Sequence, residues 1–250
     1  MNRERILQHV ATPLNAPAYA PAVARFTDRE YLNVVYRTDP EALRAVVPEP
    51  LEFDEPLVRF EIMNMGEATS FGPYVEAGQA IPVRLGEERG EYLHAMYLDN
   101  FPATVAGREA SAYPKVMGRP ALKVDDAALV GTLDYGSERV ATATMGYKWF
   151  PMDLAAAEAE ITVPTYMLKL VPGYDHRPRI AELVRTRITD ITVKQAFTGP
   201  ARLQLFEHAL APLADLPVRE VVSASHVITD LTLSGVTPVH DYLAEEGVQA

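Results

Sequence analysis

Lys115 is the residue of this chain whose surroundings best suit a nucleophile. It is one of only five lysines among 250 residues, and its segment is mostly small, apolar and aromatic: Arg108-Glu109-Ala110-Ser111-Ala112-Tyr113-Pro114-Lys115-Val116-Met117-Gly118. A lysine that loses contact with water gives up its proton more easily, so a neutral amine becomes available near neutral pH. The residues leave one alternative open, in which the stem lies on apolar surface while the ammonium reaches water. The segment therefore makes Lys115 a candidate for imine formation with a carbonyl compound.

Charged side chains that could assist such a lysine occur upstream, on Arg29, Glu61 and Glu76. In an extended strand Glu61 would share a face with Arg59 rather than with its apolar neighbours, because side chains alternate between the two faces. Glu76 stands where a loop passes into a strand, and Arg29 lies between two acidic residues. Taken by themselves, these three positions are typical of solvated surface.

Composition and motifs exclude several other classes of function. A formal net charge of -11 argues against binding to nucleic acid, because phosphate backbones are neutralised by clustered Lys and Arg. Without cysteine there is no thiolate ligand or cysteine nucleophile, and the six histidines lack the spacing of a compact metal site. Glycine-rich phosphate loops and a Gly-x-Ser-x-Gly turn are also missing, although a distant Ser-His-Asp set stays open. An acidic protein that acts on small solutes fits better.

The helices and strands that position these candidate residues are expected to belong to one domain, residues 1–250. Neither internal repeats nor a linker-like change in composition divides the chain. The beginning of the chain lacks an apolar signal core, and no apolar run is long enough for a membrane span, so we expect a cytoplasmic protein without membrane partners.

Local patterns predict few helices and many strands. Helices are expected over residues 3–10, after the N-cap Asp39, and over residues 103–109, where Asn100, Phe101 and Pro102 give a similar start just ahead of Lys115. Residues 129–135 and 139–147 flank turn residues and predict a hairpin, and the alternation around Thr189, Ile191 and Val193 predicts a strand with one buried face. The fold class is therefore α+β, dominated by antiparallel strands.

Many segments, in order along nearly the whole chain, resemble the acetoacetate decarboxylase family. Besides the segment around Lys115, they include Phe26-Thr27-Asp28-Arg29-Glu30-Tyr31, Glu55-Pro56-Leu57-Val58-Arg59-Phe60-Glu61-Ile62-Met63, Glu76-Ala77-Gly78-Gln79-Ala80-Ile81-Pro82-Val83 and Tyr166-Met167-Leu168-Lys169. The resemblance implies the family's cone-shaped closed β-barrel with flanking helices. One position departs from the family, whose typical members carry a second lysine directly after the imine-forming one. Here that residue is Val116.

The resemblance also implies a site and a reaction. Lys115 would form a Schiff base with a 3-oxo acid such as acetoacetate, which would be converted to acetone and carbon dioxide without a metal or organic cofactor. Arg29 would position the substrate carboxylate. Glu76 would hold Arg29 and disfavour that carboxylate, and Glu61 would transfer protons. Tyr113 and Phe26 are expected as pocket walls that exclude water.

Two other functions stay open. A relative of the family could use the same lysine for aldol or dehydration chemistry on a 2-oxo acid, and a non-catalytic barrel could bind a small ligand with the lysine buried only as a stem. The resemblance further implies a homo-oligomer, commonly a dodecamer in this family. The preferred chain length of the substrate is not determined by these patterns.

Overall fold

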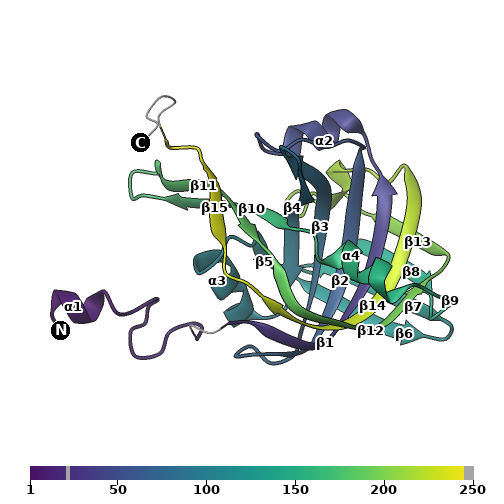
Figure 1. Cartoon of the computed structure of the whole chain (residues 1–250), viewed down its shortest axis with the longest axis horizontal. Coiled ribbons are helices and arrows are strands. Elements are labelled where there is room, and N and C mark those ends of the chain that lie inside the picture. Colours follow the sequence, from purple (N-terminus) through teal and green to yellow (C-terminus); the bar gives the residue numbers. More distant parts are fainter. Residues whose placement is uncertain (21–22, 245–250) are drawn as a thin grey trace.

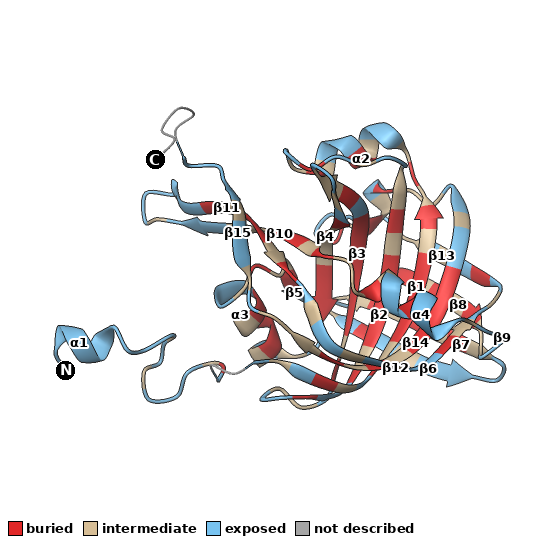
Figure 2. Cartoon of the chain, in the orientation of Figure 1, coloured by how far each residue is buried: buried red, intermediate tan, exposed pale blue. Residues whose placement is uncertain are grey.

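The computed structural model describes residues 1–20 and 23–244. Strands dominate the body of the molecule, and the N-terminal segment with its short helix extends away from it (Figure 1). Most of this N-terminal segment is exposed, whereas buried residues concentrate on the central strands (Figure 2). The central strands are therefore the part of the fold that can hold a water-excluding site.

The helices are short, and each of the three expected ones begins within two residues of the predicted position. Asp39 and Asn100 are N-caps, and the Asn100 Oδ1 accepts a hydrogen bond from the Ala103 N–H at 2.9 Å. The first helix ends four residues early, because none of its residues is buried and an isolated helix of this length is marginal. Within the described residues no helix is long and apolar enough to cross a membrane. The helices are α1 (Arg3–Ile6), α2 (Pro40–Val46), α3 (Phe101–Glu109), α4 (Leu154–Ile161), which was not predicted, and the 3-10 helix η1 (Leu213–Asp215).

An eleven-stranded sheet carries most of the chain. Its order is β15-β11-β10-β4-β3-β2-β1-β14-β12-β9, with β5 paired to β4. Neighbours are antiparallel except for β10 and β5, which both run parallel to β4. The strands are β1 (Arg25–Arg37), β2 (Leu57–Ala68), β3 (Tyr74–Leu85), β4 (Glu88–Leu98), β5 (Lys115–Met117), β9 (Phe150–Pro151), β10 (Thr165–Pro172), β11 (Pro178–Thr186), β12 (Ile188–Thr198), β14 (Glu220–Leu233) and β15 (Thr237–Asp241).

A second, four-stranded sheet has the order β13-β8-β7-β6, formed by β6 (Arg119–Asp125), β7 (Ala128–Tyr135), β8 (Glu138–Gly146) and β13 (Ala201–Leu205). The predicted hairpin is confirmed as β7 and β8, joined by a turn in which Gly136 has φ 62°. β12 is also confirmed as a strand, but its alternation is broken between Thr189 and Thr192, and Thr189 is exposed.

The α+β class with mainly antiparallel strands is confirmed, but the closed barrel is not. A barrel closes only when the two end strands of its sheet pair with one another. Among the described residues, the pairings of the large sheet run from β15 to β9 and stop there, so both sheets are open.

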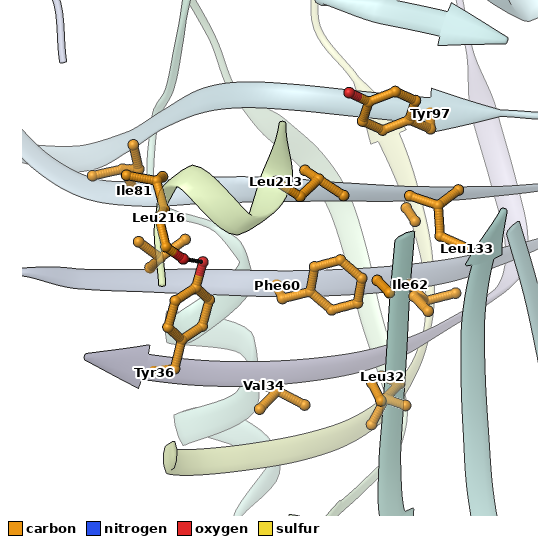
Figure 3. Packing of buried hydrophobic residues seen from close by; sticks show 14 of the residues in the cluster. Leu32, Val34, Tyr36, Phe60, Ile62, Ile81, Tyr97, Leu133, Leu213 and Leu216 are labelled. Carbon is orange, nitrogen blue, oxygen red and sulfur yellow. Dashed lines mark hydrogen bonds between the residues drawn. The ribbon is translucent and has the colours of Figure 1, made fainter. Parts of the chain in front are cut away.

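The two sheets pack face to face around an apolar core. Leu32 and Val34 of β1 and Phe60 and Ile62 of β2 point into this core (Figure 3). A Cβ on Gly131 of β7 would lie 2.5 Å from Ile62 Cδ1, so the absence of a side chain at this glycine allows the sheets to approach closely. Because strand side chains alternate, the residues between these positions face the other side, where the candidate site lies.

Candidate active site

Lys115 is buried at the first position of β5. Its parallel pairing with Met96 of β4 fixes the backbone, and the side chain is only 7% exposed, whereas the neighbouring Val116 is 38% exposed. The ammonium lies 3.2 Å from Glu76 Oε2 and 5.2 Å from the centroid of the Tyr113 ring. The alternative of a surface lysine with a solvated ammonium is therefore wrong.

Helix α3 holds the stem of Lys115 in place. A Cβ on Gly107 would lie 2.6 Å from Lys115 Cδ, so the lysine stem packs directly on the helix backbone at a point where only glycine leaves room. Arg108 donates a hydrogen bond to the Lys115 carbonyl oxygen at 3.1 Å. The ammonium of Lys169 on β10 donates to the carbonyl oxygens of Arg108 and Ser111, which satisfies acceptors at the C-terminal end of α3.

A β-bulge turns Arg29 into the same cavity. Two residues of β1, Thr27 and Asp28, lie opposite one residue of β14, and Asp28 has φ 53°. The extra residue places Phe26 and Arg29 on one face although they are three positions apart. A Cβ on Gly66 of β2 would lie 2.9 Å from the Asp28 carbonyl oxygen, so a glycine is needed opposite the bulge.

The guanidinium of Arg29 is buried without a carboxylate partner. Among the described residues no Asp or Glu oxygen lies within 4.0 Å of it, and its Nε has no hydrogen-bond partner. Its neighbours are the Met63 sulfur at 2.8 Å and the Tyr31 ring at 4.8 Å. Burial by itself would lower the pKa of Arg29, but Tyr31, Glu76 and Glu61 outweigh it, so the pKa is raised and the charge retained. A buried cation with free donors is suited to an anionic ligand.

The expected contact between Glu76 and Arg29 is not found within the described residues, because Glu76 faces the ammonium of Lys115 instead. Glu61 shares a face with Arg59, as expected, and its Oε2 lies 3.3 Å from Arg59 Nε. All three positions that resemble solvated surface in isolation are buried, namely Arg29, Glu61 and Glu76.

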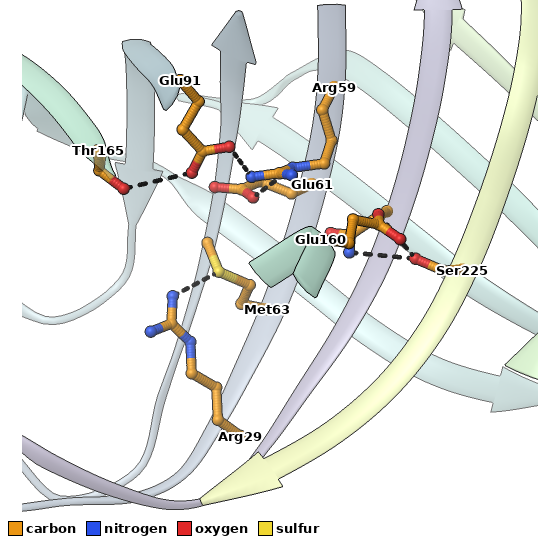
Figure 4. A network of polar contacts seen from close by, with 9 residues as sticks. Arg29, Arg59, Glu61, Met63, Glu91, Glu160, Thr165 and Ser225 are labelled. Carbon is orange, nitrogen blue, oxygen red and sulfur yellow. Dashed lines mark hydrogen bonds and ion pairs between the residues drawn. The ribbon is translucent and has the colours of Figure 1, made fainter. Parts of the chain in front are cut away.

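Two residues outside the predicted set complete this polar cluster. Arg59 also contacts Glu91 of β4, which accepts a hydrogen bond from Thr165 at 3.4 Å (Figure 4). The sequence pattern places Arg59 beside Glu61, but nothing local to Glu91 indicates burial, because it precedes Tyr92 in a strand of ordinary alternating composition. The partnership of Arg59 and Glu91 depends on β2 and β4 meeting across β3.

The predicted residues converge on a cavity of about 60 Å³, with Tyr113 and Phe26 in its wall as expected. A second cavity, of about 600 Å³, adjoins it and is lined mainly by apolar residues. Phe26, Tyr74, Tyr113 and Lys115 border both, so the amine lies where the two spaces meet. Burial raises the pKa of Tyr74 and of Tyr113, so both hydroxyls stay protonated near neutral pH.

The arrangement suits covalent chemistry on a small anionic carbonyl compound. It offers an amine in an apolar and aromatic setting, a free buried guanidinium for an anion, and two carboxyl groups for proton exchange, Glu61 and Glu76.

Comparisons with known proteins agree with this chemistry. Residues 11–243 match the sequence profile of the family described as acetoacetate decarboxylase (ADC). The chain is 61% identical to an acetoacetate decarboxylase of Streptomyces nogalater, over 98% of this chain and 100% of that protein. It is 56% identical to one of Clostridium acetobutylicum, over 97% and 100%. A solved structure from structural studies of acetoacetate decarboxylase superposes with a TM-score of 0.96 at 56% identity, over 98% and 100%.

Proposed function

We propose, from the premise that this chain belongs to the acetoacetate decarboxylase family, that it converts acetoacetate to acetone and carbon dioxide through a Schiff base on Lys115. The carboxy-lyase activity follows from the high identity to acetoacetate decarboxylases over nearly the full chain. The mechanism rests mainly on one observation. The buried amine of Lys115 shares a small cavity with the guanidinium of Arg29, which pairs with no carboxylate among the described residues.

The reaction begins with attack of the neutral Lys115 amine on the ketone carbon. Loss of water leaves a protonated imine, with one proton supplied by an acid in the cavity. The bond to the carboxylate carbon then breaks, carbon dioxide leaves, and the bonding electrons move to the imine nitrogen to give an enamine. Protonation on carbon and hydrolysis release acetone and the free amine. The cycle consumes one proton for each acetoacetate anion.

The side chains around the amine are assigned roles by their positions. Arg29 holds the substrate carboxylate, since its side chain lines the cavity and has no carboxylate partner among the described residues. Glu76, 3.2 Å from the Lys115 nitrogen, stabilises the positive charge of the protonated imine and repels the substrate carboxylate, which favours its loss as neutral carbon dioxide. Glu61 exchanges protons during imine formation. Phe26 and Tyr113 exclude water.

Reductive trapping tests the mechanism. Treatment with acetoacetate and borohydride should inactivate the protein and add one substrate-derived group per chain, which peptide mass spectrometry should locate on Lys115. Lys123→Met, at an exposed lysine, is the matched control and should be labelled as the unchanged protein is. Labelling of Lys123 or Lys148, or no labelling, would contradict the proposal and favour a non-catalytic ligand-binding protein.

A second assay separates decarboxylation from chemistry on 2-oxo acids. Carbon dioxide release from acetoacetate should greatly exceed any condensation of pyruvate with an aldehyde, because Arg29, Glu61 and Glu76 are all present beside the lysine. The reverse result would favour the aldolase or dehydratase alternative.

The remaining expectations concern the whole protein. We infer a single functional unit over residues 1–250, supported by a family match that runs unbroken from 11 to 243. We also infer a cytoplasmic location and a homo-oligomer. Assembly is supported by large apolar side chains exposed on β10 and on the segment after it, such as Leu170 and Tyr174. Light scattering on the purified protein tests the assembly, and a monomer would contradict it.

A further inference from the structure

A second charge cluster lies directly behind Glu61. The guanidinium of Arg59 contacts two carboxylates, Glu61 through Nε at 3.3 Å and Glu91 through Nη2. The other oxygen of Glu91 accepts the hydrogen bond from Thr165 (Figure 4). All these side chains border the cavity that contains Lys115. A change of charge on Glu91 therefore alters how firmly Arg59 holds Glu61.

The charges around the cavity balance only while Lys115 is protonated. Its charged residues that are buried or nearly so are three cations and three carboxyl groups, namely Arg29, Arg59 and Lys115, and Glu61, Glu76 and Glu91. Arg187 also borders the cavity, but it is half-exposed and paired with Glu88. The reacting complex needs a neutral amine and contains an anionic substrate, so it carries two more negative charges than the balanced state. Uncompensated charge in a buried space is costly, and protonation of a carboxyl group relieves it.

Glu91 is suited to take up that proton near neutral pH. Burial raises the pKa of Glu91 to about 7, against the opposing effect of Arg59. Glu61 on β2 and Glu160 on α4 raise this pKa further, whereas the hydrogen bond from Thr165 lowers it. Tyr113, which the charge of Glu91 also affects, stays neutral because burial raises its own pKa.

We propose that Glu91 is a positioning residue that takes up one proton from solvent as the anionic 3-oxo acid enters. The neutral Glu91 then no longer competes with Glu61 for the guanidinium of Arg59. The inference rests on the proposed function for the identity of the anion. The proton balance is closed, because conversion of a 3-oxo acid anion to a ketone and carbon dioxide consumes one proton. The net uptake of one proton in each turnover equals the one C–H bond that forms in the ketone, and Glu91 returns to its ionised form when the products leave.

Coupling of this kind makes anion affinity depend on pH in a predictable direction. Below the pKa of Glu91 the carboxyl group is already protonated, and the anion binds without further cost. Above it each binding event must also take up a proton, so affinity falls by up to tenfold for each pH unit. A purely structural Glu91 would change stability or turnover without producing this slope.

Direct binding of butanoate tests the coupling, since this unreactive carboxylate has the length of the substrate and is ionised throughout the range from about pH 6 to about pH 8.5. Calorimetric titration should give a Kd that rises about tenfold per pH unit above about pH 7. In Glu91→Gln the Kd should change less than about twofold across the range, because the amide mimics the protonated carboxyl group. The matched control Glu87→Gln, at an exposed glutamate in the turn four residues before Glu91, should keep the slope of the unchanged protein.

Thr165→Val provides a second test that does not remove the carboxyl group. Loss of the hydrogen bond to the carboxylate should move the onset of the slope upward by about half a pH unit. The pH profile of adduct formation with 2,4-pentanedione, an uncharged diketone that reports on the amine, should be the same in the variants and in the unchanged protein.

The outcomes separate this inference from the proposed function. A protein that decarboxylates acetoacetate but binds butanoate equally well across the range, or whose slope persists in Glu91→Gln, would overturn the role of Glu91 alone. A protein that shows the slope but neither decarboxylates nor forms a diketone adduct would keep the proton coupling and overturn the proposed function.

Discussion

The two faces of strands β1 and β2 contain opposite kinds of interior. On one face Leu32, Val34, Phe60 and Ile62 form a dry apolar core against the second sheet. Polar groups there bind to one another or to the backbone, as where the Tyr36 hydroxyl donates to the Leu216 carbonyl oxygen at 3.1 Å and accepts from the Gln79 amide (Figure 3). On the opposite face of the same two strands, the side chains of Arg29, Arg59 and Glu61 place buried or nearly buried charges around a cavity.

The difference shows how one pair of strands supplies both stability and chemistry. Burial of the core face stabilises the fold, whereas the site face retains charges whose removal from water costs free energy. Arg29 is the clearest case, because its Nε has no partner and it lies beside a bulge with a positive φ at Asp28. Substitutions on the two faces should therefore separate stability from activity.

The largest effect is expected on the core face. Phe60→Ala should lower the free energy of unfolding by about 3–5 kcal/mol, because it removes a fully buried ring and leaves a cavity. Urea unfolding measures this loss, and Phe150→Ala, at an exposed phenylalanine, should cost far less. If Phe60→Ala instead removed activity at unchanged stability, the assignment of this face to structure would be wrong.

Gly107→Ala should impair activity while sparing stability. The added Cβ would lie 2.6 Å from Lys115 Cδ and displace the amine, and a misplacement of about 1 Å can cost about 100-fold in rate. Alanine is also the better helix former by about 0.8–1.0 kcal/mol, so the unfolding midpoint should not fall.

Kinetics and thermal unfolding of the Gly107→Ala protein check both expectations together. Gly235→Ala is the matched control, since its Cβ would meet no described atom within 4 Å although Gly235 also borders the outer cavity. Equal losses in the two variants would rule out a specific clash with Lys115.

Arg29→Gln should lower kcat/KM for acetoacetate about 10- to 150-fold, since a hydrogen bond to a charged group contributes about 1.5–3 kcal/mol. Imine formation with the uncharged 2,4-pentanedione should remain, because this ligand lacks the carboxylate. Stability should stay level or rise, since a partnerless buried cation has been removed. Arg25→Gln, at an exposed arginine on the same strand, is the control. Parallel loss of both reactions would indicate a structural role for Arg29.

The smallest effect is expected at Val116, the position that departs from the family. Val116 is exposed while Lys115 is buried, so a lysine at 116 would point to the opposite side of β5. Two charges roughly 10 Å apart at an effective dielectric near 20 interact by about 1.7 kcal/mol, or about one pH unit. Val116→Lys should therefore shift the pH profile of Lys115 acylation by about one unit at most and change decarboxylation by about tenfold or less.

Val124→Lys, at another exposed valine, controls for a general effect of added charge. A shift of about two units, or activity seen only in the Val116→Lys protein, would show that a neighbouring charge governs the amine more than burial does.

Local sequence determined the parts of this protein that depend on near neighbours. The N-caps Asp39 and Asn100, the β7–β8 hairpin and the shared face of Arg59 and Glu61 follow from turn chemistry and from the two-residue period of strands. The apolar surroundings of Lys115 also indicated its burial, because Ser111 and Tyr113, shortly before it in the chain, line the same outer cavity.

Tertiary structure alone decided which distant residues meet. Arg29 turns inward only because β14 pairs with β1 through a bulge, and Glu76 reaches Lys115 rather than Arg29 because β5 docks parallel to β4, next to β3. Glu91 joins Arg59 for the same kind of reason, across the intervening strand β3. Strand order and register are set by packing between segments far apart in the chain, so a local pattern cannot contain them. The open edges of the sheet, where a closed barrel was expected, were decided at that level too.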